Sequence, residues 1–153
     1  MKRVWQIGVV VRNLERTAAG LMDLFDMKEL PLINRVGRKF VSEGCRTVYK
    51  GDKKSMASCM TCCFEFENIE IEFIQPCGEE PSEWKNFLDK YGEGIHHLGW
   101  KIEDVNEAEK LFQSKGYKEI QSGNWGEGEY HYFDTKQTLG FVIEVLKFYN
   151  ETN

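Results

Sequence analysis

An internal repeat restricts the folds open to this chain more than any other feature of its sequence. Residues 5–25, WQIGVVVRNLERTAAGLMDLF, align without a gap on residues 96–116, HHLGWKIEDVNEAEKLFQSKG. Each copy starts with a short apolar run, passes through polar residues and continues with apolar residues near the 3.6-residue helical period. The repeat therefore predicts two equivalent units, each beginning with a strand and then a helix.

Capping residues and later apolar runs extend each unit. Asn13 and Asp104 are predicted helix N-caps, the second with Glu107 three residues further on, as in a capping box. Strands are then expected at KELPLI, near Phe40, at SCMTCCFEF and at IEIEFIQ in the first half, and at YKEIQS, YHYFD and FVIEVLKF in the second. The predicted fold class is α+β, with two βαβββ modules in tandem forming a curved mixed sheet around a central cleft.

The stretch EEPSEWKNFLDKYGEG separates the two halves. Pro81 and Ser82 indicate the start of a helix, and Gly92 and Gly94 indicate its end. Each half is short for an independent domain, so we expect a single domain over residues 1–153. Its expected parts are module one at about 3–76, a linker helix at about 81–92 and module two at about 95–149.

Composition argues against several classes of partner. A net charge of −5 and an isoelectric point near 5.3 disfavour nucleic-acid binding, which depends on clustered Lys and Arg. No apolar run approaches the roughly 18 residues of a membrane-spanning helix, so no membrane partner is expected. Five cysteines, three of them in CMTCC, favour free thiols in a reducing compartment. The N-terminal MKRVWQIGVVV is interpreted as a first strand and not as a signal peptide, so a cytoplasmic location is expected. Cys59 and Cys62 are three apart on a predicted strand and should point to opposite faces.

The repeat also brings together side chains that can bind a metal. Gln6 aligns with His97, and laying IEIEFIQ on FVIEVLK aligns Glu72 with Glu144. Equivalent positions of two fused repeats should face each other around a pseudo-twofold axis, so the four side chains are expected in one cleft. An amide, an imidazole and two carboxylates suit one divalent ion: zinc, nickel, cobalt or manganese.

A simpler interpretation of these residues stands beside the metal site. Glu70 and Glu72 would then form the solvent face of an alternating strand, and His97 would be a hydrogen-bonded histidine. Glu144 weighs against it, because it has apolar neighbours in GFVIEVL and an unpaired buried carboxylate costs several kcal/mol.

The doubled module, the strand start GIHHLGW and the late strand FVIEVL resemble the vicinal-oxygen-chelate superfamily of glyoxalases, bleomycin-resistance proteins and extradiol dioxygenases. The resemblance covers nearly the whole chain. Within it, PSEWKNFLDKYGEGIHHLGWKIEDV is similar to the linker and second module of methylmalonyl-CoA epimerases. It implies that the metal ligands are Gln6, Glu72, His97 and Glu144.

Two positions depart from the epimerase pattern. Epimerases usually have histidine where this chain has Gln6 and often glutamine where it has Glu72, and the set Gln-Glu-His-Glu resembles lactoylglutathione lyases instead. The epimerases' second proton-transferring glutamate has no unambiguous match, and Glu65, Glu67 and Glu43 are candidates for it.

The function expected from this resemblance is that of a metal-dependent isomerase that moves a proton on the carbon next to a thioester carbonyl. Glu144 is the first choice for the catalytic base and Glu72 is its symmetry mate. The alternatives are a lactoylglutathione lyase acting on a hemithioacetal and a non-catalytic protein that sequesters its ligand. Because Trp84 and Trp125 are expected to be exposed, and because the family commonly dimerises, a homodimer is also predicted.

Two further histidines are interpreted more simply. His96 should point to the face of its strand opposite His97 and serve packing. His131, in EYHYFD, either lines the cleft or lies at the surface.

Overall fold

The computed structural model describes residues 3–37 and 45–150. Short connections join its elements, and strands predominate. In chain order the elements are β1 (Gln6–Val10), α1 (Leu14–Leu24), β2 (Ile33–Gly37), β3 (Thr47–Tyr49), β4 (Ser58–Glu65), β5 (Glu70–Cys77), α2 (Glu83–Tyr91), β6 (Gly94–Lys101), α3 (Val105–Ser114), β7 (Glu119–Asn124), β8 (Gly128–Phe133), α4 (Lys136–Leu139) and β9 (Val142–Phe148).

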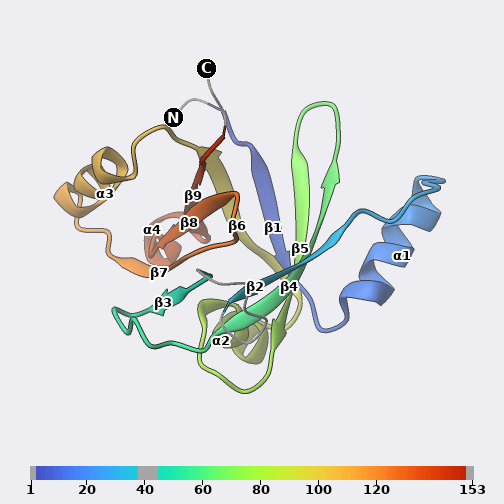
Figure 1. Ribbon diagram of the computed structural model, residues 1–153, viewed down its shortest axis with the longest axis horizontal. Coiled ribbons are helices and arrows are strands. Elements are labelled where there is room, and N and C mark those ends of the chain that lie inside the picture. The colour runs from blue at the N-terminus through green and yellow to red at the C-terminus, as the bar shows by residue number, and fades with distance from the viewer. Residues whose placement is uncertain (1–2, 38–44, 151–153) are drawn as a thin grey trace.

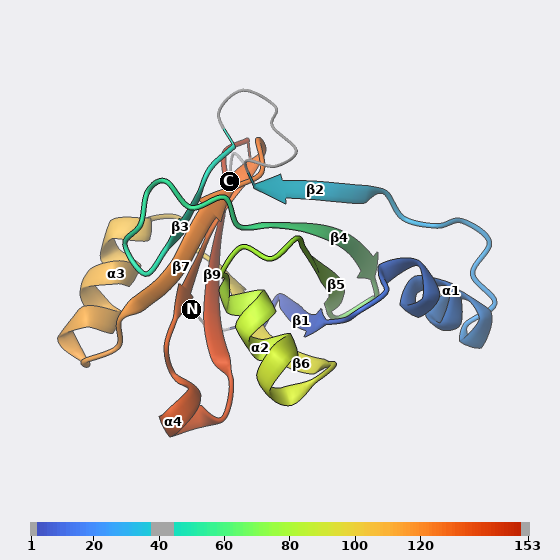
Figure 2. The same cartoon turned by 90° about the horizontal axis from the view of Figure 1, so that it is seen from below.

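All nine strands of the described residues belong to one curved, nearly closed sheet (Figure 1), in the order β2-β4-β5-β1-β6-β9-β8-β7-β3. Its centre is the antiparallel pair β1 and β6, and each of these strands has a parallel neighbour, β5 and β9 respectively. The helices α1 and α3 lie at opposite ends of the molecule, with the strands between them (Figure 2). This arrangement confirms the predicted α+β fold with a curved mixed sheet.

The first half differs from the prediction in two places. KELPLI is not a strand: β2 begins only at Ile33, where pairing with Cys62 of β4 starts. Pro31 explains the delay, because proline has no backbone N–H to donate to a sheet ladder. The predicted strand near Phe40 lies outside the described residues.

The short strand β3 was not expected. It leaves the first half of the chain and pairs antiparallel with β7, at the far edge of the second half. The two halves are therefore joined at the edge of the sheet as well as at its centre, and the proposed division into two modules and a linker stays a prediction.

The predicted helix caps are confirmed. The side chain of Asn13 accepts a hydrogen bond from the backbone N–H of Arg16, and that of Asp104 accepts from Asn106 and Glu107. These bonds satisfy backbone donors that have no partner within the first turn of a helix.

The linker helix has the same kind of start. The hydroxyl of Ser82 accepts a hydrogen bond from the backbone N–H of Lys85, and Gly92 ends the helix at φ 80°. A positive φ of this size favours glycine, which explains why the helix stops there.

The longest described helix, α1, has only 11 residues, and no described helix is long and apolar enough to cross a membrane.

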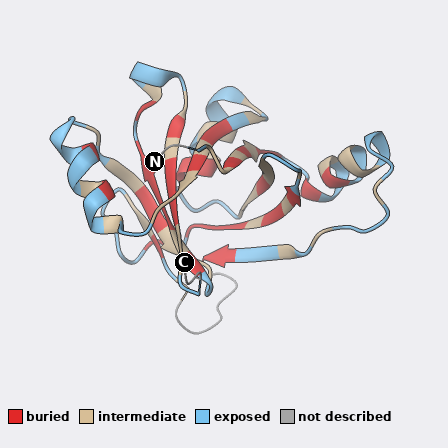
Figure 3. Ribbon diagram, turned by 90° about the horizontal axis from the view of Figure 1, so that it is seen from above, coloured by how far each residue is buried: buried red, intermediate tan, exposed pale blue. Residues whose placement is uncertain are grey.

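Buried residues lie mainly along the strands, and fewer of them lie on the helices (Figure 3). One apolar cluster surrounds Trp84 and includes Cys59, whereas a second, beneath α1, includes Cys62. The two thiols thus lie on opposite faces of β4, as predicted. All five cysteines are among the described residues, and none forms a disulfide.

The expectation that Trp84 is exposed is wrong. Its side chain is 2% exposed, and its indole N–H donates a 2.9 Å hydrogen bond to the hydroxyl of Tyr132. The helix α2 lies against β1, β5 and β6, so its apolar side faces the sheet and not a partner. Trp125 is half-buried beside Phe148. The homodimer therefore loses one of its two sequence arguments and stays a prediction.

Trp84→Phe should destabilise the protein by about 1–3 kcal/mol, because it removes buried contacts and leaves the hydroxyl of Tyr132 without its donor. Trp125→Phe is the matched control and should cost less, because that indole is only half-buried. Urea unfolding followed by circular dichroism measures both. Equal losses for the two variants would contradict the assigned role of Trp84.

Candidate metal and active site

The central strand pair positions two of the predicted ligands. Across β1 and β6, Gly8 stands opposite His97 and Gln6 stands opposite Gly99. Each ligand-capable side chain thus faces a glycine on the neighbouring strand. The repeat makes the two arrangements equivalent, because Gly8 aligns with Gly99 as Gln6 aligns with His97.

The parallel neighbours supply the two carboxylates in the same symmetric way. Glu72 on β5 lies beside Gly8, and Glu144 on β9 lies beside Gly99. Because side chains alternate between the faces of a strand, this register places both carboxylates on the face occupied by Gln6 and His97.

The donor atoms of the four side chains meet around the Nε2 atom of His97. Glu144 Oε2 lies 3.1 Å away, Gln6 Oε1 3.4 Å and Glu72 Oε2 3.7 Å. His97 is fully buried and Glu144 is 2% exposed. The structure therefore brings the four sequence-predicted residues together, and their role as ligands stays a prediction.

Glu70 orients the amide of Gln6. Gln6 Nε2 donates a 2.6 Å hydrogen bond to Glu70 Oε1, which leaves the amide oxygen directed at His97. Sequence reasoning had treated Glu70 only as part of a solvent face. Its position two residues before Glu72 was the available signal, because both then lie on one face of β5.

His96 does not lie on the face opposite His97, so that expectation is wrong. The pairing of β6 with β1 skips His96, since Gly8 pairs with His97 and Val9 with Ile95. This β-bulge brings the two imidazoles together, with their Nδ1 atoms 3.0 Å apart. His96 packs against Phe87 and Tyr132, which fits its expected packing role.

Gln6, Glu72 and Glu144 line a cavity of about 300 Å³ between the first and second halves of the sheet, whereas the fully buried His97 is not part of its lining. Aromatic residues of the second half form one side of it, including Trp125, Tyr130 and Tyr132. Larger grooves of about 740 and 500 Å³ lie elsewhere on the surface and contain none of the predicted ligands.

The cavity lining is strongly acidic, with five glutamates: Glu65, Glu70, Glu72, Glu127 and Glu144. Within the described part of the chain, no lysine or arginine lines it. Of the three candidates for a second proton-transferring glutamate, Glu65 lines the cavity, Glu67 does not, and Glu43 lies outside the described residues.

Burial and like charges act together on the carboxylates. Desolvation raises the pKa of Glu72 well above its ordinary value, and the negative charges of Glu144 and Glu70 raise it further. Desolvation also raises the pKa of Glu70, although the hydrogen bond from Gln6 opposes this. Ionising the whole cluster without a counter-charge is therefore unfavourable.

A divalent cation fits this arrangement. Glu144 Oε2 is buried and makes no hydrogen bond with the described residues, despite its short distance from His97. A buried, unpartnered carboxylate oxygen is costly, and a cation offsets that cost. Three oxygen donors and one imidazole nitrogen are typical of first-row divalent metals.

A protein-family profile described as Glyoxalase/Bleomycin resistance protein/Dioxygenase superfamily matches residues 5–133. The chain belongs to this superfamily. The match confirms the resemblance carried by the doubled module, and it spans both copies of the sequence repeat. Members of the superfamily often bind a divalent metal. A search among curated proteins found no match.

Similar solved structures include methylmalonyl-CoA epimerases. The Mycobacterium tuberculosis enzyme superposes with a TM-score of 0.64 at 17% identity, over 95% of this chain and 87% of the other. A Streptomyces coelicolor epimerase variant in complex with 2-nitronate-propionyl-CoA gives 0.67 at 16% identity, over 99% and 97%. A hypothetical protein from Bacillus halodurans gives 0.67 at 16%, also over 99% and 97%. At these identities the likeness shows the fold.

Gly8→Ala should disrupt the site of this superfamily member. A Cβ atom at Gly8 would lie 1.9 Å from Cε1 and 2.1 Å from Nε2 of His97, so the buried imidazole would have to move. We expect a loss of about 1–3 kcal/mol in unfolding free energy, together with weaker binding of added divalent metal. Gly94→Ala, where the nearest atom is 4.0 Å away, is the control. Urea unfolding and metal titration measure the two effects, and indistinguishable variants would contradict the close packing.

The metal-free protein should show a pH dependence that comes from Glu72. The folded-state pKa of Glu72 is raised above the ordinary 4.5, so protonation of this carboxyl stabilises the folded protein. The stabilisation is fully present below the ordinary pKa and is lost as the pH rises through the folded-state pKa. Wild type should therefore lose stability relative to Glu72→Gln as the pH increases. Urea unfolding in chelator between about pH 5 and 8 measures the difference. Glu15→Gln, on the outer side of α1, is the control, and a pH-independent difference for Glu72→Gln would refute the prediction.

Proposed function

We propose that this chain is a metal-dependent isomerase that removes and returns a proton on the carbon next to a thioester carbonyl, as in a methylmalonyl-CoA epimerase. The observation that carries the proposal is the placement of Glu72 and Glu144 on either side of one buried imidazole. Inverting a carbon centre requires proton transfer on two faces, and two carboxylates from opposite arms of the sheet meet that requirement.

Gln6, Glu72, His97 and Glu144 would hold the ion. A bound divalent ion supplies a Lewis acid that polarises the carbonyl oxygen, which lowers the cost of the enolate by several kcal/mol. Glu144 is our choice for the group that takes the proton, and Glu72 for the one opposite it. The raised pKa of Glu72 supports this role, because a proton-transferring carboxyl works best when its pKa approaches the working pH.

The cavity also suits the acyl end of a thioester. At about 300 Å³ it lies at the lower limit of ordinary ligand pockets, so the acyl group fits inside and the rest of a coenzyme A molecule would extend beyond it. The similar solved structures include an epimerase in complex with methylmalonyl-CoA, with a TM-score of 0.66 at 16% identity. That likeness supports the choice of substrate class through the fold alone.

The donor set favours a second candidate. A lactoylglutathione lyase also moves a proton next to a carbonyl, and Gln6 presents its amide oxygen to the site as the Gln-Glu-His-Glu pattern of those enzymes implies. A sequestering protein that binds no metal is the third alternative, and elemental analysis of the purified protein separates it from both enzymes. The predicted homodimer and cytoplasmic location belong to this proposal as well.

Glu144→Gln and Glu72→Gln should each lower the rate of α-proton exchange by about 100- to 10,000-fold, because each removes one proton-transferring group. The assay incubates metal-loaded protein with methylmalonyl-CoA in deuterated water and follows incorporation of deuterium by mass spectrometry. Glu15→Gln, an exposed carboxylate on α1 that does not line the cavity, is the control and should retain the activity of wild type.

Parallel assays separate the candidates. Wild type that exchanges no α-proton but converts the hemithioacetal of methylglyoxal and glutathione, followed by ultraviolet absorbance, would replace the epimerase with the lyase. Wild type that binds metal and catalyses neither reaction would overturn both.

A further inference from the structure

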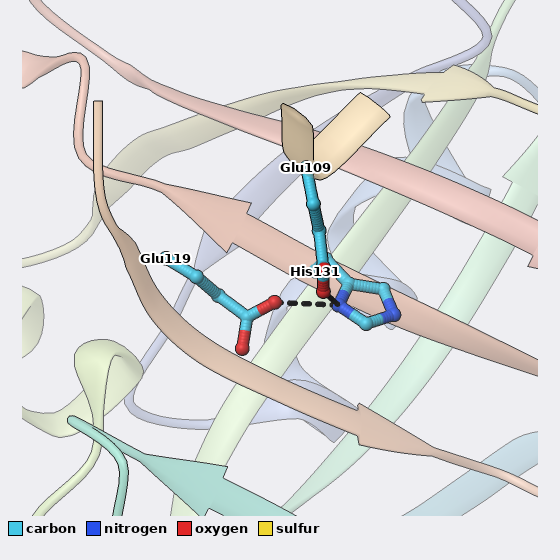
Figure 4. A group of neighbouring side chains, drawn as sticks. All are labelled: Glu109, Glu119 and His131. Atoms are coloured by element: carbon cyan, nitrogen blue, oxygen red, sulfur yellow. Dashed lines mark hydrogen bonds and ion pairs between the residues drawn. The ribbon is translucent and has the colours of Figure 1, made fainter. Parts of the chain in front are cut away.

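A second group of metal-binding side chains lies outside the cleft. Glu109 from α3, Glu119 from β7 and His131 from β8 converge, with one donor atom of each within 4.8 Å of the others (Figure 4). Glu119 Oε2 is 2.6 Å from His131 Nδ1, and Glu109 Oε1 is 3.9 Å from it. Sequence reasoning left the position of His131 open, and the structure shows that it does not line the cleft.

Strand alternation explains why this group is separate from the first site. Tyr130 and Tyr132 line the central cavity, so His131 between them points to the other face of β8. There α3 approaches the sheet and packs against β9. Three separate elements therefore each contribute one donor to the same point.

The imidazole of His131 has an unsatisfied atom within the group. The residue is 9% exposed, and its Nε2 atom is buried without a hydrogen bond to the described residues. This atom faces Glu129, whose Oε2 lies 3.8 Å away. A metal-bound histidine characteristically directs its other ring nitrogen at a carboxylate, which fixes the tautomer and the ring orientation.

Charge also favours a cation here. Three glutamates surround one histidine, so the group stays negative even when the imidazole is protonated. Arg46 and Lys53 line an adjacent cavity together with Glu129 and His131, but Glu109 and Glu119 are not part of that cavity. The carboxylates of Glu109 and Glu119, next to Nδ1 of His131, are therefore the ones available to bind an ion.

We propose that Glu109, Glu119 and His131 form a second divalent-metal site, which holds an ion such as Zn²⁺ through two carboxylate oxygens and the Nδ1 atom of the imidazole. The hydroxyl of Ser122 donates a 2.8 Å hydrogen bond to Glu119 Oε1, which orients that carboxylate and leaves Oε2 for the ion. Three protein donors leave room for water in a tetrahedral zinc shell.

An ion at the proposed site would stabilise the folded protein. The site joins α3 to β7 and β8, and an ion that binds only the folded state stabilises it in proportion to the logarithm of its concentration above the dissociation constant. The site does not depend on the proposed isomerase activity, because none of its residues lines the central cavity.

Zinc titration of the full chain after removal of metal by a chelator tests the proposal. Wild type should bind one more Zn²⁺ per chain than Glu109→Gln, or bind the corresponding ion at least about tenfold more tightly. The side chain of Glu109 is 35% exposed, so this substitution spares the core. Glu107→Gln, an exposed carboxylate two residues earlier on α3, is the matched control and should bind as wild type does.

Thermal unfolding gives a second readout. Added Zn²⁺ should raise the melting temperature of Glu144→Gln, in which the central site is impaired, and should raise it less when Glu109→Gln is added. Equal zinc stoichiometry and affinity in wild type and Glu109→Gln would overturn the proposal. If the central cleft binds no metal, wild type should still bind one ion that Glu109→Gln lacks, so failure of the isomerase proposal remains distinguishable.

Discussion

Two glycines must stand opposite two larger side chains in the central strand pair for the candidate site to exist. Gly8 leaves the space that the imidazole of His97 occupies, and Gly99 leaves space beside Gln6 and Glu144, where a Cβ atom would lie 2.9 Å from Glu144 Oε2. Glycine in a strand interior costs stability, and it is typical where another group must approach the backbone closely. Gly8 and Gly99 are also paired residues of β1 and β6, so the same two positions belong both to the sheet pairing and to the site.

The cleft adds an electrostatic cost to that constraint. Five glutamates line a cavity in which no described residue supplies a positive side chain, and burial raises the pKa of Glu70 and Glu72. A chain selected for stability alone would place apolar residues here. Departures from ordinary burial rules are typical of functional sites, and the rest of the fold compensates with apolar clusters beneath α1, α2 and α3.

Sequence reasoning reached the features that follow from the repeat. Duplication predicted the strand-helix units, the capping residues Asn13 and Asp104, and the convergence of Gln6 with His97, because these depend on local patterns and symmetry. It missed features that depend on contacts between distant segments. β3 pairs across the sheet with β7, Trp84 is buried by the packing of α2, and a bulge places His96 beside His97. Each depends on tertiary packing that no local periodicity records.

The strand β8 shows how one segment serves two different environments. Tyr130 and Tyr132 face the acidic cavity, and Tyr132 also contacts the rings of His96 and His97. His131 faces the opposite side, among three glutamates. β8 pairs with β9, which carries Glu144. A shift of β8 against β9 by one residue would turn Tyr130 and Tyr132 away from the cleft and turn Glu129 and His131 into it. His131 contacts Glu109 of α3 and Glu119 of β7 on the outer face, so the same one-residue shift would break these contacts together with the aromatic wall of the cleft.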